Sequence, residues 1–196
     1  MQYKQLALDM IQASYDNALD RQTDRQTDRQ TLAQKIAKAQ KALRLAADMS
    51  QKYYGEPLIV TYSGGKDSDV LLHLAEECLK AGDFVVMNSH TTVDAPETVY
   101  HIREVFKRLD AKGIKTKIDY HKHEDGSTTT MWSLIIEKEI PPTRLVRYCC
   151  QELKENGTPH RICALGVRAA ESVKRQGRDV FGIRGGELQP SYIFFT

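Results

Sequence analysis

The sequence predicts an α/β fold, a parallel twisted sheet with helices on both faces, preceded by an N-terminal helical extension. Short apolar, β-branched runs alternate with segments whose apolar residues recur at helical spacing, which is typical of βαβ units. Polar clusters follow several predicted strands, and ligands of parallel sheets bind beyond the carboxyl ends of the strands. A length of 196 residues suits one domain with an appendage.

Residues 1–31 are predicted to form the helical extension. Residues 1–19 carry apolar side chains close to helical spacing, among them Leu6 and Met10. Residues 20–31 repeat Asp-Arg-Gln-Thr three times and contain no apolar residue, so the repeat cannot contribute to a core. We interpret it as a solvated helix or linker, with an interaction arm for a partner as the alternative.

Residues 32–196 are predicted to form the α/β domain. An apolar stripe that begins at Leu32 predicts a helix ending near Gly55. Asp94 is expected to cap a later helix that has Pro96 in its first turn. Val70 is expected on the buried face of the helix that follows the first strand. The predicted strands are 58–62, 84–88, 114–120 and 162–166, and the other predicted helices are 69–80, 96–109, 131–140 and 149–154.

A glycine-rich turn joins the first predicted strand to the helix behind it. Adjacent glycines let the backbone approach a ligand closely, and the free N–H groups and dipole of a helix N-terminus favour an anion. A lysine adds a positive charge, and two serines add hydroxyl donors. The turn is therefore predicted to cradle phosphate, with a plain capped βα turn as the alternative. Its residues are Ser63, Gly64, Gly65, Lys66, Asp67 and Ser68.

The turn fits neither the Walker pattern nor the G-x-G-x-x-G dinucleotide pattern. Its S-G-G-x-D-S sequence resembles the pyrophosphate-binding loop (PP-loop) of the ATP pyrophosphatase and phosphoadenosine-phosphosulfate (PAPS) reductase superfamily. Residues 88–98, 141–154 (with Cys-Cys-x-x-Leu-Lys) and 166–172 (Gly-Val-Arg-x-x-Glu-Ser) resemble the PAPS reductase family and occur in its order. The resemblance spans roughly residues 32–175. It implies an adenine nucleotide α-hydrolase-like fold that binds ATP, adenylyl sulfate or PAPS.

The resemblance also implies roles for single residues. The loop would hold phosphates, with Lys66 as a catalytic residue. Arg168 corresponds to the arginine of the family's G-x-R-x-x-E-S element, which faces the anionic end of the nucleotide, and is the second catalytic candidate. Arg147 and Lys154 flank the cysteine pair and are expected to neutralise phosphate or sulfate, because basic side chains pair with tetrahedral oxyanions. His90, after the second predicted strand, is assigned to the same nucleotide site.

The chain has four cysteines. Cys78 and Cys163 lie in apolar segments and are expected in the core. Cys149 and Cys150 follow basic residues and open a predicted helix, where a thiolate would be favoured, so they are catalytic candidates. Iron–sulfur members of the family add a later Cys-x-x-Cys, which this sequence lacks, so no cluster is expected.

Reductases of the family attack sulfur with a cysteine near the chain end, whereas no cysteine follows Cys163 here. The expectation is that the chain is truncated relative to the family or performs different chemistry. Three functions stay open. One is a PAPS reductase-like oxidoreductase of sulfur metabolism, served by a thioredoxin-like thiol reductant. Another is an ATP-pyrophosphatase-type sulfurtransferase or adenylating enzyme, in which Asp67 would hold Mg²⁺. The last is a non-catalytic nucleotide-binding subunit.

Composition narrows the partners. A net charge of +2 gives no general case for nucleic acid, so a nucleic-acid acceptor has no support beyond the resemblance. No apolar run approaches the ~20 residues that a membrane helix needs. The polar N-terminus and the sparse cysteines favour a reducing cytoplasm. A small-molecule nucleotide is the expected ligand, and a homo-oligomer stays open.

Overall fold

The computed structural model describes residues 5–6, 8–13, 16, 31–123, 125–155, 161–167, 180–182 and 192–195. The repeat at residues 20–30 and Arg168 lie outside these residues, so the expectations for them stay predictions.

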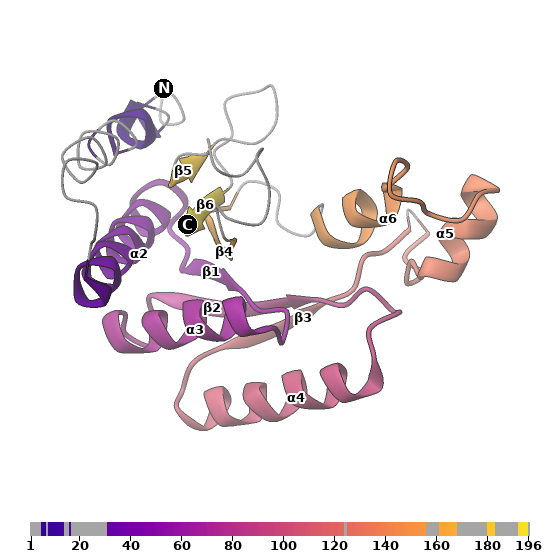
Figure 1. The fold of residues 1–196 in the computed structure, drawn as a ribbon, viewed down its shortest axis with the longest axis horizontal. Helices are drawn as coiled ribbons and strands as arrows, with labels where there is room; N and C mark the ends of the chain where they lie inside the picture. The colour runs from indigo at the N-terminus through magenta and orange to yellow at the C-terminus, as the bar shows by residue number, and fades with distance from the viewer. Residues whose placement is uncertain are drawn as a thin grey trace.

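A six-stranded sheet with the order β3-β2-β1-β4-β6-β5 forms the centre of the molecule (Figure 1). Every neighbouring pair is parallel except β5 with β6, which is antiparallel. The predicted α/β class is confirmed, and four strands fall close to their predicted positions. β5 and β6 were not predicted. β5 has only two residues, which is too short for a periodic signal. The strands are β1 (Leu58–Thr61), β2 (Phe84–Ser89), β3 (Thr116–Asp119), β4 (Cys163–Gly166), β5 (Phe181–Gly182) and β6 (Tyr192–Phe195).

The helices that alternate with the strands begin and end at recognisable signals. Thr31 caps the first long helix by accepting a hydrogen bond from the Gln34 N–H at 3.4 Å. Gly55 ends the same helix in the left-handed conformation, with φ +65°, as its position in the sequence predicted. The elements are α2 (Leu32–Tyr54), α3 (Lys66–Cys78), α4 (Pro96–Ala111), α5 (Met131–Lys138), α6 (Tyr148–Cys150) and the π-helix η1 (Gln151–Glu155).

The core lies between one face of the sheet and α2, α3 and α4. Alternate strand residues such as Val60 and Val86 point into it, while Ile59, Met87 and Cys163 form a smaller buried cluster on the other face. Helical residues near the N-terminus add Leu6, which is fully buried in the main core. Described residues of this N-terminal helical segment therefore pack into the main core.

The apolar stripe of α2 is buried only from Ala42 onward, and Leu32 is 74% exposed. Two local predictions were wrong. Val70 is exposed, because α3 presents Leu71, Leu72 and Ala75 to the core instead. Asp94 does not cap α4, because the helix begins at Pro96 and its N-cap is Ala95.

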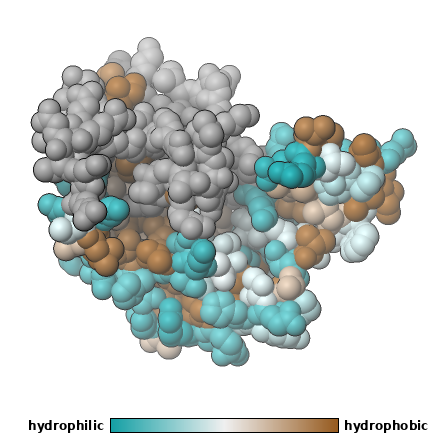
Figure 2. Space-filling model, viewed as in Figure 1, coloured by the Kyte–Doolittle hydropathy of each residue, from teal (hydrophilic) through white to brown (hydrophobic). Residues whose placement is uncertain are grey.

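The segment from α5 to α6 projects from the body of the molecule (Figure 1). Figure 2 shows hydrophobic side chains on the surface of this projection. Within this segment Trp132, Ile136 and Leu145 are each more than half exposed. No helix within the described residues is long and apolar enough to cross a membrane.

Candidate functional site

The glycine-rich loop leaves β1 and turns at once into α3. Tyr62 follows the strand and is fully buried, whereas Ser63 is exposed. Gly64 has φ +73°, a left-handed conformation that favours glycine, and Gly65 is the N-cap of α3. A Cβ at Gly64 would lie 3.1 Å from the Ile102 Cγ1 atom of α4, so the loop also packs tightly against α4.

Ser68 holds the loop in its turned conformation. Its hydroxyl donates to the Gly65 carbonyl oxygen at 2.7 Å and accepts from the Gly65 N–H at 3.1 Å. It also accepts from the Ser63 N–H at 3.3 Å. The side chain is 6% exposed, so these bonds are shielded from water. The Ser68 hydroxyl therefore acts on the shape of the loop.

Gly166, the last residue of β4, lies directly against this loop. A Cβ there would be 2.9 Å from the Asp67 carbonyl oxygen and 3.3 Å from the Ser68 nitrogen. Distances this short force the backbone to shift, so only glycine fits at this position. The carboxyl end of β4 and the start of α3 are thereby brought into contact.

Tyr62 anchors the start of the loop to two helices. Its hydroxyl donates to Asp69 Oδ1 at 2.6 Å and lies 3.1 Å from His101 Nε2. Burial raises the pKa of the Tyr62 hydroxyl above its ordinary value, and the hydrogen bond to Asp69 raises it further. The phenol therefore stays protonated as a donor to Asp69, fixing β1 to α3.

The end of β2 completes the same edge of the sheet. Asn88 is buried, and its amide donates to the Tyr62 carbonyl oxygen at 2.8 Å. Asp94 accepts from the Thr91 hydroxyl at 2.7 Å and from the Thr91 N–H at 3.2 Å. Asp94 thus closes the loop after β2, in place of the capping role predicted for it.

These elements surround a cavity of about 280 Å³ at the carboxyl ends of β1, β2 and β4. Lys154 of η1 also lines this cavity, so η1 adds a positive charge to its wall. Apolar and polar groups both face the space. The lining residues are Thr61, Tyr62, Ser63, Ser68, Met87, Asn88, Ser89, Thr91, Asp94, Lys154, Leu165, Gly166 and Val167.

The structure brings some of the predicted site residues together. Ser63, Ser68 and Lys154 line the cavity, while Lys66 is exposed at the first position of α3. Gly64, Gly65 and Asp67 complete the loop between them.

Two other predicted residues lie away from the cavity wall. His90 stacks edge-on against Tyr120, with ring centroids 5.1 Å apart, and lies 3.9 Å from Asp94 through Nδ1. The Arg147 guanidinium donates to Cys150 Sγ at 3.5 Å, outside the residues that line the cavity.

The expectation of a thiolate at the cysteine pair was wrong for Cys149. Burial raises the pKa of the Cys149 thiol, and the neighbouring Cys150 raises it further. The α6 segment has only three residues, so it offers little helix dipole to oppose this. Cys163 is fully buried and Cys78 is half-buried against the core, as predicted.

The described residues contain no group of three or more His, Cys, Asp or Glu that could hold a metal ion. Mg²⁺ in phosphate sites is usually held by one or two carboxylates together with phosphate oxygens of the substrate. The carboxylate of Asp67 fits this arrangement, since Asp67 lies at the turn itself.

Sequence reasoning missed the roles of two residues in this edge. Asn88 bridges β1 and β2, and its polar side chain at the end of an apolar strand was the available signal. Gly166 was quoted only as part of a motif, although a glycine that ends a buried strand is a sign of close backbone approach.

Comparison with family models gives one match. The model of the phosphoadenosine phosphosulfate reductase domain matches residues 57–190. This range includes the loop, the residues that line the cavity and the motifs at 141–154 and 166–172. The chain belongs to this family. The resemblance inferred from the four motifs of the PAPS reductase family is thereby confirmed.

Comparison with curated proteins gave no significant match. Among solved structures, the PAPS reductase-family chain is similar to an NH3-dependent NAD synthetase from Campylobacter jejuni subsp. jejuni NCTC 11168 in complex with the nitrate ion. The two share 16% sequence identity with a TM-score of 0.39, and the match covers 68% of this chain. The chain spans 58% of the length of that synthetase.

Proposed function

We propose that the protein is a PAPS reductase-like enzyme of sulfur metabolism that binds an adenine nucleotide with its phosphates on the loop of residues 63–68. One observation carries the proposal: a left-handed glycine turn opens α3 beside a cavity at the carboxyl ends of β1, β2 and β4. Parallel α/β sheets bind ligands at this edge, and helix N-termini bind phosphate there.

Different residues of the site contact different parts of the nucleotide in this proposal. The backbone N–H groups at the start of α3 donate to phosphate oxygens, and Lys66 supplies an exposed charge beside them. Lys154 provides a second charge from η1. Asn88 and Ser89 offer polar contacts deeper in the cavity, and Met87 and Leu165 offer apolar surface for a base.

A second candidate is ATP cleavage between the α- and β-phosphates, with transfer of the adenylyl group to an acceptor. The positions of the cysteines favour it. Cys163 is buried in the core, and Cys149 is a poor thiolate outside the cavity wall. In this reaction pyrophosphate would leave from the loop, and Asp67 would hold Mg²⁺, which would offset the charge of the leaving group. The acceptor is a small molecule or a nucleic acid, and the cytoplasm remains the proposed compartment.

The two reactions release different products. Purified protein is incubated either with ATP and Mg²⁺ or with PAPS and a dithiol reductant, and pyrophosphate and sulfite are assayed. Sulfite supports the sulfur-reducing reaction, in which the dithiol is oxidised to a disulfide. Pyrophosphate without sulfite supports ATP cleavage and rules out the reductase. Neither product, with saturable nucleotide binding, leaves a binding subunit.

Lys66→Ala tests the site itself. Removal of its charge is expected to weaken nucleotide binding by about tenfold, the loss of one charge-assisted hydrogen bond. Lys107→Ala is the control, because Lys107 is an exposed lysine of α4 paired only with Glu104 within the described contacts. Equal affinity of the two variants would show that the loop does not hold the phosphates.

A further inference from the structure

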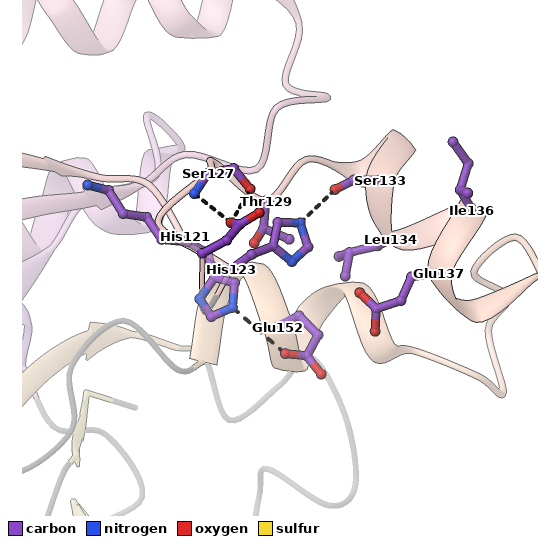
Figure 3. Close-up of a pocket in the computed structure, with 11 residues that line it drawn as sticks. His121, His123, Ser127, Thr129, Ser133, Leu134, Ile136, Glu137 and Glu152 are labelled. Atoms are coloured by element: carbon purple, nitrogen blue, oxygen red, sulfur yellow. Dashed lines mark hydrogen bonds and ion pairs between the residues drawn. The ribbon is translucent and has the colours of Figure 1, made fainter.

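A second, larger cavity of about 840 Å³ lies beyond the carboxyl end of β3, between the strand's continuation, α5 and η1. Figure 3 shows the rings of His121 and His123 and the carboxylates of Glu137 and Glu152 directed into this space. None of these four residues lines the 280 Å³ cavity beside the loop. The nucleotide site therefore does not use them.

Hydrogen-bond acceptors dominate the wall of this cavity. Asp125, Glu137 and Glu152 bring carboxylates, whereas Lys122 is the one lysine or arginine among the described lining residues. Neutral histidine rings also offer an acceptor nitrogen. A ligand rich in N–H donors and positive charge matches this set, and an anion does not.

Two of the carboxylates stay ionised at neutral pH. The Ser127 hydroxyl and N–H donate to Asp125 at 2.6 and 2.8 Å, and these bonds lower the pKa of Asp125. The hydrogen bond from Lys138 lowers the pKa of Glu137. Lys138 offsets the charge of Glu137, so the negative charge of the wall rests on Asp125 and Glu152, against one lining lysine, Lys122.

His121 and Glu152 lie side by side in the wall of this cavity. The His121 Nε2 atom lies 3.9 Å from the Glu152 Oε2 atom, beyond hydrogen-bond distance, and each side chain is 28% exposed. No ligand atom fits between the two atoms, but a planar guanidinium beside the pair can donate one N–H to each of them. His123 is held differently, because its Nε2 atom lies 3.2 Å from the Ser133 hydroxyl.

Thr129 gives independent evidence of a missing ligand. Its side chain lines the cavity and is 1% exposed, yet its hydroxyl has no hydrogen-bond partner among the described residues. A buried hydroxyl without a partner costs roughly 1–3 kcal/mol, so native proteins usually satisfy it. A polar ligand in this cavity would supply that partner.

Two residues of the π-helix η1 give the two cavities side chains of opposite charge. Lys154 faces the cavity beside the loop, and Glu152, two residues earlier, faces the larger cavity. The first is suited to phosphate and the second to a cation. Both lie at the carboxyl edge of the same sheet, the edge at which the substrates of such folds gather.

We propose that the larger cavity binds a small organic cation, a guanidinium or ammonium compound, through Glu152, His121 and Thr129. In the adenylyl-transfer reaction proposed as the second candidate, this cation would be the acceptor beside the nucleotide, and only that role rests on the proposed function. Binding itself needs no nucleotide.

Butylguanidinium is the probe, and butylurea, its neutral isostere, is the matched control ligand. Both are titrated into the full chain, with the imidazole proton signals of His121 and His123 followed by NMR. Butylguanidinium is expected to saturate below about 10 mM and to shift both rings, with butylurea about tenfold weaker or more. Equal binding of the two ligands, or no saturation by the cation, overturns the proposal.

Two variants locate the cation. Glu152→Gln is expected to weaken butylguanidinium binding by about tenfold, and Thr129→Val by about threefold. Glu77→Gln is the control, because Glu77 also faces a histidine, His73 at 3.2 Å, but on α3 and outside the cavity. Unchanged affinity in Glu152→Gln overturns the proposal.

Failure of this inference is distinguishable from failure of the nucleotide site. Lys66→Ala is expected to weaken nucleotide binding and leave butylguanidinium binding unchanged, while Glu152→Gln does the reverse. Nucleotide binding without cation binding refutes the second cavity alone. Cation binding without nucleotide binding supports the cavity and refutes the nucleotide site.

Discussion

Gly166 and Asp67 are in backbone contact: the Cβ position of Gly166 points at the Asp67 carbonyl oxygen, 2.9 Å away. The contact joins the end of β4 to the first turn of α3. The two elements lie about half of the chain's length apart in the sequence. The loop thus owes its position to a glycine that lies outside it.

The first prediction is that Gly166→Ala displaces the loop. The added methyl group has to push the α3 backbone aside, which costs about 1–3 kcal/mol. We expect a lower free energy of unfolding by urea denaturation and a nucleotide affinity reduced about tenfold. Gly82→Ala is the control, because nothing lies within 4 Å of its Cβ position. An alanine at 166 with normal affinity would show that the contact does not set the loop.

Gly64 allows backbone strain to be separated from crowding. Its φ of +73° disfavours alanine, and its Cβ position is 3.1 Å from Ile102 Cγ1. Gly113 has a similar φ of +77° with nothing within 4 Å. We predict a loss of about 1 kcal/mol for Gly113→Ala and of about 2 kcal/mol or more for Gly64→Ala, from thermal or urea unfolding. Equal losses would mean that Ile102 moves aside freely.

Much of the fold was readable because its signals are local. The helix stop at Gly55 and the apolar strands 58–62 and 84–88 each lie within a few residues of the feature they predict. The antiparallel edge β5–β6 was not readable, since two residues carry no period. The exposure of Val70 depends on which face of α3 meets the sheet, and that is fixed by tertiary packing.

The site was readable only in part. Adjacent glycines and a lysine after a strand predict a phosphate loop, because that chemistry needs close backbone approach and positive charge. Lys154 and Glu152 face different cavities because they lie on the π-helix η1, and no sequence pattern predicted a π-helix here. The position of His90 against Tyr120 likewise follows from the path of β3 beside β2.

Ser68 is predicted to matter through the shape of the loop. Ser68→Ala removes the bonds to both backbone groups of Gly65 and leaves them without these partners in a largely buried setting. We expect unfolding stability to fall by about 1–2 kcal/mol and nucleotide affinity to fall about fivefold. Thr143→Ala is the control, since it also removes a hydroxyl that accepts from a backbone N–H, that of Val146, but on the projecting segment. If affinity falls while the backbone NMR shifts of the loop stay unchanged, the hydroxyl contacts the ligand directly instead.

Asp9 is predicted to make stability depend on acid pH. It accepts a hydrogen bond from the Tyr53 hydroxyl and forms an ion pair with Lys52 Nζ at 3.0 Å. These two contacts join the N-terminal helical residues to α2. The Tyr53 hydrogen bond is the largest cause that lowers the pKa of Asp9 from 3.8 to about 2. A carboxyl whose pKa is depressed by folding adds stability above its unfolded pKa, and that stability is lost as the pH falls through the folded value.

Asp9→Asn tests this dependence. The difference in unfolding free energy between the native chain and the variant should be constant above pH 5, shrink from about pH 4 downward and reach its minimum only below about pH 2. Urea denaturation at closely spaced pH values measures it. Tyr53→Phe removes the principal donor, so it should flatten the same region of the curve by itself. A difference that stays constant down to pH 2 would contradict the depressed pKa, because the carboxylate would then titrate alike in the folded and unfolded chains.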